Sequence, residues 1–202
     1  MPMCTVHYPA GSISEEQKTA LGEEMTNVLL MIEGGQDTPG GRSIAWVMFN
    51  EIPEANWFVG GKTDRSFVSE AGKFLVVVTV PEGSMNKERK SLVHKAVNDS
   101  FLKLTGTKGI EGAGRSVWVQ IAEIPEGHWG TSGKTAGVMG IAMIAGLTPK
   151  SPILDYTRSY LDAKERWMDG AAYPEDAAGR AIVRYRWARP QGEALTTCCS
   201  VI

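Results

Sequence analysis

Residues 7–21 read HYPAGSISEEQKTAL and residues 79–93 read TVPEGSMNKERKSLV, so two related segments follow one another at a spacing of 72 residues. The same spacing relates the two copies of Glu-Ile-Pro-Glu that begin at Glu51 and Glu123. An internal repeat of this kind indicates a duplicated structural unit. We therefore expect two units, a linker and a C-terminal extension, over residues 1–62, 63–72, 73–134 and 135–202.

Each unit has the pattern of a strand, an amphipathic helix and a second strand. The apolar run FLVVVTV at residues 74–80 predicts a strand buried on both faces, and Ser14–Gln17 has the spacing of a helix capping box. The second strands are expected over Ser43–Glu51 and Ser116–Glu123. Long crossovers between such strands favour parallel β-α-β units. The sequence thus predicts an α+β fold, an α/β sandwich in which two tandem β-α-β units form a four-stranded sheet with two helices on one face.

The extension at residues 135–202 carries helical and strand patterns of its own. Ala136–Leu147 is apolar and rich in small residues, so we expect it to be buried. Ser151-Pro152 has the signature of a helix start, and the helix is expected to run to about Asp169. Alternation over residues 180–187 indicates a strand. The sequence assigns no role to this segment.

Composition excludes several classes of partner. The 202 residues include 21 basic and 23 acidic side chains, which does not suit a nucleic-acid-binding protein. The longest apolar run falls well short of the roughly 20 residues that a membrane helix needs, and no secretory leader is evident. We expect a soluble, cytoplasmic protein with no membrane partner. No cofactor or metal is expected, because the chain lacks glycine-rich phosphate loops and metal-ligand clusters.

Met1-Pro2 at the start of the first strand is the feature that suggests a chemistry. An initiator methionine before proline is usually removed, which would leave Pro2 with a free secondary amine. An apolar environment or a nearby arginine disfavours the ammonium form of an amine and lowers its pKa. Pro2 is therefore a candidate general base. The matching position in the second unit is Phe74, which has no free amine.

A strand beginning with proline, the EEQK helix start, the EIPE strand ends and the NWFVGGK and HWGTSGK segments together resemble the tautomerase superfamily. The two-unit arrangement is similar to its fused members of the cis-3-chloroacrylic acid dehalogenase type. The resemblance implies a β-α-β fold, a homotrimer and catalysis by Pro2. It also implies a small-molecule carboxylate as substrate.

The chain departs from the family at the anion-binding positions. The arginine of the short tautomerases is replaced by Trp46 and Trp118, and the arginine near the helix start by Ile13 and Met85. The tyrosine of the dehalogenase type falls on Gln120. We therefore take a different set as candidate substrate-binding residues: Arg115, Arg42, Trp118 and Trp129. Strand parity places Arg42 on the face of Trp46 and Arg115 opposite Trp118, and Arg115 is slightly favoured.

Three functions remain open on this evidence. The leading hypothesis is a tautomerase or isomerase that uses Pro2 as general base on an α-keto or enol carboxylate. The second is a proline-dependent hydratase, dehalogenase or decarboxylase of the same superfamily. The third is a non-catalytic trimeric binding protein.

Overall fold

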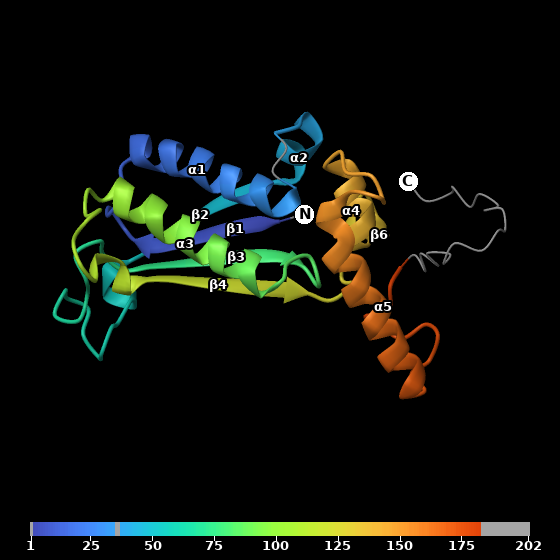
Figure 1. Ribbon diagram of the computed structural model, residues 1–202. Helices are drawn as coiled ribbons and strands as arrows, with labels where there is room; N and C mark the ends of the chain where they lie inside the picture. Colours follow the sequence, from blue (N-terminus) through green and yellow to red (C-terminus); the bar gives the residue numbers. More distant parts are fainter. Residues whose placement is uncertain (1, 35–36, 183–202) are drawn as a thin grey trace.

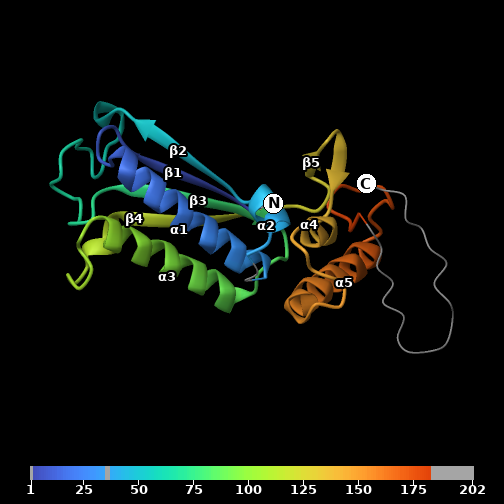
Figure 2. The same ribbon diagram turned by 90° about the horizontal axis from the view of Figure 1, so that it is seen from above.

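The computed structural model describes residues 2–34 and 37–182. Its main body is a four-stranded sheet of order β2-β1-β3-β4, with helices α1 and α3 lying on one face (Figures 1 and 2). The strands and helices of the body are β1 (Met3–Pro9), α1 (Glu15–Glu33), β2 (Trp46–Ile52), β3 (Phe74–Pro81), α3 (Lys87–Leu104) and β4 (Val117–Ile124). The predicted α+β fold of two β-α-β units is confirmed.

The pairing of the strands sets which ends of the two units meet. β1 is parallel to β2 and β3 is parallel to β4, as expected for β-α-β units. The two units join through an antiparallel pairing of β1 with β3, in which Met3 lies opposite Thr79 and Val6 opposite Val76. The start of β1 therefore lies beside the end of β3, and the start of β4 lies at the other end of the sheet.

Alternation along the strands builds the core between the sheet and its two helices. Cys4, Val6 and Tyr8 of β1 point to the helices and are almost wholly buried. The capping box at the start of α1 is formed as predicted: the Ser14 side chain accepts from the Gln17 N–H at 3.2 Å, and the Gln17 side chain accepts from the Ser14 N–H at 2.9 Å.

The opposite face of the sheet is uncovered in a single chain. Trp118 is 68% exposed and Trp46 is 51% exposed on this face, and Met48 is also exposed. Leu75 and Val77 of β3 are only partly buried. The expectation that residues 74–80 are buried on both faces therefore holds for the helix side alone.

Short helices precede both second strands. α2 (Pro39–Ile44) begins where the Thr38 side chain accepts from the Gly41 N–H at 2.9 Å, with proline at its first position. The 3₁₀-helix η2 (Ala113–Ser116) leads into β4, and η1 (Glu54–Asn56) follows β2. The strand starts expected at Ser43 and Ser116 were wrong by a few residues, because these local turns end just before the strands.

The extension packs at the end of the sheet where the chain begins (Figures 1 and 2). A hairpin of β5 (Trp129–Thr131) and β6 (Lys134–Ala136) leads into it from the end of the second unit. Its described helical segments are α4 (Val138–Ile144), η3 (Pro152–Leu154) and α5 (Asp155–Gly170). The helix predicted from Ser151 to about Asp169 corresponds to η3 and α5. Most of the strand predicted over residues 180–187 lies outside the described residues. No helix in the described part of the chain has the length and apolar character needed to cross a bilayer.

Candidate active site

Pro2 is buried at the start of β1, at the end of the sheet that the extension covers. Its carbonyl accepts a hydrogen bond from the Trp46 N–H at 3.3 Å, which ties it to the start of β2. Because β1 and β3 are antiparallel, the neighbouring strand end is Pro81 and the turn that leads into α3. Pro2 is thus fixed by backbone pairing on a rigid element.

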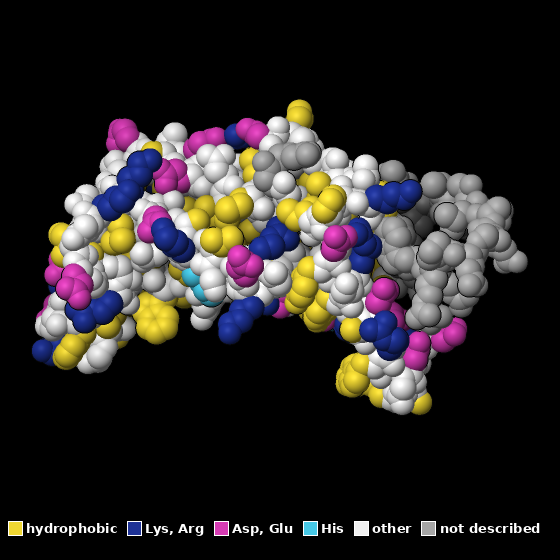
Figure 3. Space-filling model, viewed as in Figure 1, with side chains coloured by type: hydrophobic (Ala, Val, Ile, Leu, Met, Phe, Trp, Pro, Cys, Tyr) yellow, Lys and Arg dark blue, Asp and Glu magenta, His cyan; other side chains and the backbone are white. Residues whose placement is uncertain are grey.

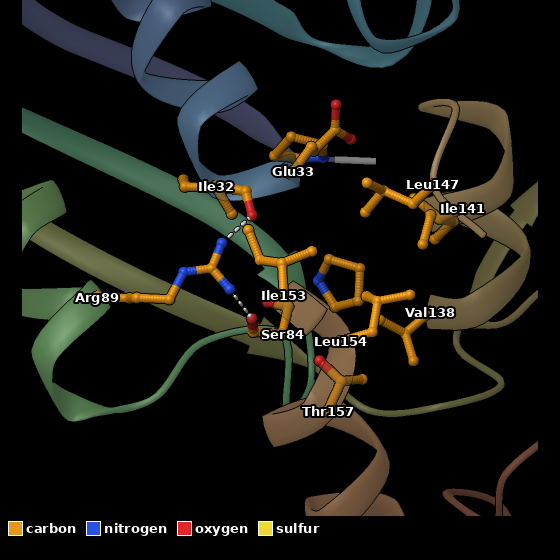
Figure 4. A pocket seen from close by; sticks show the side chains of 13 residues that line it. Ile32, Glu33, Ser84, Arg89, Val138, Ile141, Leu147, Ile153, Leu154 and Thr157 are labelled. Carbon is orange, nitrogen blue, oxygen red and sulfur yellow. Dashed lines mark hydrogen bonds between the residues drawn. The ribbon is translucent and has the colours of Figure 1, made fainter. Parts of the chain in front are cut away.

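A cavity of about 40 Å³ lies against Pro2. A volume of this size holds no more than about three water molecules. Its lining is mostly apolar and comes from the end of α1, the turn after β3, α3, and the extension (Figure 4). The residues are Pro2, Ile32, Glu33, Pro81, Ser84, Arg89, Val138, Ile141, Ala142, Leu147, Ile153, Leu154 and Thr157.

Arg89 of α3 is the cation among the described residues that line this cavity. Its guanidinium donates to the Ser84 carbonyl at 3.1 Å and to the Ile32 carbonyl at the end of α1 (Figure 4). It also donates to the Met31 carbonyl at 3.5 Å. α1 has no basic residue in its own last turn, so Arg89 supplies the positive charge that a helix C-terminus favours. Among the described residues Arg89 has no carboxylate partner, and burial lowers its pKa.

Glu33, the last residue of α1, places both carboxylate oxygens out of solvent, and neither has a hydrogen-bond partner among the described residues. Burial raises the pKa of Glu33 to about 7, and the N-terminal ammonium opposes that rise only in part, because a carboxylate is poorly solvated inside a protein. The Ser84 hydroxyl is likewise buried and unpartnered within the described chain. The site therefore offers a carboxyl group that can hold or release a proton near neutral pH.

The extension closes the cavity, and specific polar contacts hold it in place. The Glu126 carboxylate accepts from the Val138 N–H at 3.0 Å, at the start of α4. Glu82 accepts from the Tyr160 hydroxyl at 2.6 Å and from the Lys164 ammonium at 2.5 Å, both on α5. Figure 3 shows hydrophobic side chains at the junction of the body and the extension. The segment to which the sequence assigned no role thus forms one wall of the site.

The two arginines expected from the sequence lie away from this cavity. Arg42 on α2 is exposed and pairs with Asp37 at 2.6 Å and with Glu23 at 2.9 Å. Arg115 lies in η2, before the start of β4 and hence at the opposite end of the sheet from Pro2. The parity comparison with the tryptophans does not apply, because Arg42 and Arg115 both lie in helical turns rather than in the strands.

The two expected tryptophans also lie outside the cavity lining. Trp118 points from β4 to the uncovered sheet face. Trp129 of β5 packs on a small cluster that contains Ile44, Ile141 and Ala145. Within one chain the structure brings only Pro2 of the predicted set to the cavity.

Sequence reasoning missed the two ionisable residues of the cavity. Arg89 lies one helical turn beyond Met85, the position at which the family has an arginine near the helix start. Glu33 carried a usable signal, since an acidic residue in the last turn of a helix opposes the helix dipole. An acidic residue at this unfavourable position therefore suggests a functional role. The described residues contain no group of three His, Cys, Asp or Glu side chains that could hold a metal ion.

Several solved structures are similar to this chain. A fused 4-OT, described as R7 wild type and an asymmetric trimer, has a TM-score of 0.53 and 22% identity over 66% of this chain and 95% of its own. Pt0534 inactivated by 2-oxo-3-pentynoate has a TM-score of 0.52 and 22% identity over 70% and 98%. N1, a member of the cis-3-chloroacrylic acid dehalogenase family, has a TM-score of 0.56 and 18% identity over 77% and 99%.

This chain has the tautomerase fold in its fused, two-unit form. No family model and no curated protein matches the sequence. These three structures are spanned almost completely, whereas 66–77% of this chain is covered in these comparisons. The candidate site of this tautomerase fold therefore includes a wall drawn from an additional segment.

The raised pKa of Glu33 predicts a pH-dependent stability. The folded state binds the proton more tightly than the unfolded chain, whose carboxyl has a pKa near 4.5. The stabilisation is fully present below pH 4.5 and is lost as the pH rises through 7. We expect the free energy of unfolding to fall by on the order of 2 kcal/mol more between pH 5 and 8 than in Glu33→Gln. Urea denaturation at both pH values measures this, and parallel pH dependences in the two proteins would contradict it.

Proposed function

We propose that this protein is an enzyme of the tautomerase superfamily in which Pro2, after removal of Met1, acts as a general base on an α-keto or enol carboxylate. The observation that carries the proposal is the burial of Pro2 against a small, mostly apolar cavity that also contains a guanidinium. Both burial and the nearby positive charge disfavour the ammonium form of a proline amine. The amine would then be neutral and reactive near pH 7 while the Glu33 carboxyl is protonated, because an ionised carboxylate beside it would favour the ammonium form.

Arg89 is the residue best placed to bind the carboxylate of such a substrate. It lines the cavity with Pro2 and lacks a carboxylate partner among the described residues. Arg42, by contrast, already pairs with two carboxylates. Three other predicted residues could reach a bound substrate only from a neighbouring copy of the chain or after a rearrangement, and they stay predictions on that basis: Arg115, Trp118 and Trp129.

The reaction follows from these placements. Arg89 holds the substrate carboxylate and draws electron density toward it, while the Pro2 nitrogen removes the enol proton. The electron pair of the O–H bond forms the carbonyl, and the double bond between the carbons takes up a proton from an acid in the site at its far carbon. The product is the α-keto isomer. Apolar walls from the extension limit the access of bulk water, so that the proton reaches the carbon from the site rather than from solvent.

The proline-dependent hydratase, dehalogenase or decarboxylase is kept as the alternative, because a buried carboxyl beside Pro2 could also direct a water molecule. In that reaction the protonated proline supplies a proton, so activity would require the cation. In the tautomerase it requires the free amine. The pH dependence of kcat/KM separates the two, and a substrate screen without any Pro2-dependent turnover would leave the non-catalytic trimeric binding protein.

We further propose that the chain assembles as a homotrimer through the uncovered sheet face. Trp46, Met48 and Trp118 together with Leu75 and Val77 leave this face largely apolar. An apolar sheet face is normally covered in a folded assembly. The fused 4-OT structure of the same fold is a trimer, which supports this assembly for the present chain.

Replacement of the Pro2 secondary amine tests the proposed catalyst. Intact-mass spectrometry is expected to show the chain without Met1. Pro2→Ala replaces the rigid secondary amine with a flexible primary amine and is expected to lower kcat/KM by about 10²-fold or more, the range for a positioned base. The electrophile 2-oxo-3-pentynoate is expected to add to the proline nitrogen by conjugate addition. Peptide mapping would find the mass of one whole reagent molecule on the N-terminal peptide. A retained Met1, or full activity of Pro2→Ala, would reject the proposal.

The assignment of the carboxylate-binding residue is tested by arginine-to-lysine changes. Arg89→Lys keeps the charge but loses the bidentate fork, so we expect KM for a carboxylate substrate to rise about tenfold or more. Arg42→Lys is the matched control and should leave KM unchanged. If Arg115→Lys raises KM while Arg89→Lys does not, the carboxylate is bound by a neighbouring copy instead.

The assembly is tested on the sheet face. Trp118→Arg places a charge in the proposed interface and is expected to convert the trimer into monomers, as measured by light scattering after size exclusion. Trp167→Arg on α5 is a matched control, because Trp167 is similarly exposed at 61% but lies outside the sheet. A monomeric wild-type chain, or a Trp118→Arg chain that remains trimeric, would contradict the prediction.

A further inference from the structure

Glu33 is a buried acid that the reaction above does not use. It ends α1 and lines the same cavity of about 40 Å³ as Pro2. Both of its carboxylate oxygens are out of solvent, with no hydrogen-bond partner among the described residues. A buried, unpartnered carboxyl group is costly in free energy, and proteins retain such groups mainly at functional sites.

The described surroundings of Glu33 offer its carboxylate no hydrogen-bond partner that would explain it as a structural residue. The charge that acts on this carboxyl is the N-terminal ammonium, which lowers its pKa and so counters part of the effect of burial. The one charged neighbour in the described cavity lining is Arg89, whose guanidinium is engaged with the carbonyls of Ile32 and Ser84 (Figure 4). The Glu33 carboxylate points away from that guanidinium in the same view. The extension contributes only apolar side chains and the Thr157 hydroxyl to the cavity. At a helix C-terminus a negative charge is also unfavourable.

We propose that Glu33 is the second proton-transfer residue of this site and works as the acid partner of Pro2. The proposal rests on the proposed function, since Pro2 must carry a free amine to be the base. Pro2 and Glu33 line one cavity that has room for about three water molecules. A substrate bound in this cavity would therefore contact both residues. The two groups come from different elements, β1 and α1, so a substrate between them can be deprotonated at one atom and protonated at another.

The step balances without any further reagent. The Pro2 nitrogen takes the enol proton, the O–H electron pair becomes the carbonyl π bond, and the carbon–carbon π pair takes the proton of the Glu33 carboxyl. This leaves a prolinium ion and a carboxylate, which neutralise each other in the low-dielectric site. The proton then returns from the Pro2 nitrogen to Glu33, directly or through one water. No net proton is exchanged with solvent during the turnover.

The experiment compares Glu33→Gln and Glu33→Asp with wild type, and uses Glu15→Gln at the exposed start of α1 as the matched control. Glu33→Gln is expected to lower kcat/KM by about 10²- to 10⁴-fold and to remove the inflection near neutral pH from its pH profile. Glu33→Asp should restore part of the activity and the inflection. Glu15→Gln should match wild type. NMR of protein with 13C-labelled glutamate side chains should show one carboxyl that titrates near pH 7 and is missing in Glu33→Gln.

Labelling of Pro2 by 2-oxo-3-pentynoate separates this proposal from the proposed function. If Glu33→Gln is labelled as wild type is but loses turnover, both proposals are supported. If it is labelled and keeps kcat/KM within twofold with an unchanged pH profile, the Glu33 proposal is overturned and the Pro2 proposal stands. If wild type is not labelled and Pro2→Ala is fully active, the proposed function fails and the acid partner fails with it. If Glu33→Gln does not fold, the NMR titration of the wild-type protein decides the question. The absence of any glutamate carboxyl that titrates near pH 7 would overturn the Glu33 proposal alone.

Discussion

The antiparallel pairing of β1 with β3 is the contact on which the rest of the structure depends. Each β-α-β unit is internally parallel, and this one pairing decides that the start of the first unit meets the end of the third strand. It therefore brings Pro2 to Pro81, to the turn that carries Ser84 and to Arg89 in the first turn of α3. With a parallel pairing instead, Pro2 would lie beside Phe74, and the cavity would have no cation from α3.

At the same end of the sheet, the end of α1 attracts a positive charge and also carries a buried acidic residue. The carbonyls at the end of α1 attract a positive charge, and Arg89 from the neighbouring helix satisfies them. Glu33 lies at that helix end as well, with its carboxylate buried and directed away from the Arg89 guanidinium. A protein under selection for stability alone gains by replacing such a carboxyl with a neutral side chain. Its presence next to Pro2 is most simply understood as a requirement of proton transfer.

The extension changes what the duplicated fold can do. It is anchored through Glu82, which follows β3, and Glu126, which follows β4; Glu82 holds α5 and Glu126 holds α4. Its apolar residues then form one wall of the cavity beside Pro2. The sheet thus positions Pro2, α1 and α3 supply the ionisable groups, and the extension contributes apolar lining.

The sequence by itself determined the duplication, the strand and helix pattern, the capping box at Ser14 and the candidacy of Pro2. All of these depend only on the identity and spacing of residues along the chain. It did not determine that Arg42 and Arg115 lie outside the cavity, since both fall in short helical turns that end before the strands. Nor could it identify Arg89 and Glu33 as the ionisable groups beside Pro2. Their burial depends on which distant segments pack over them, and only the tertiary structure decides that.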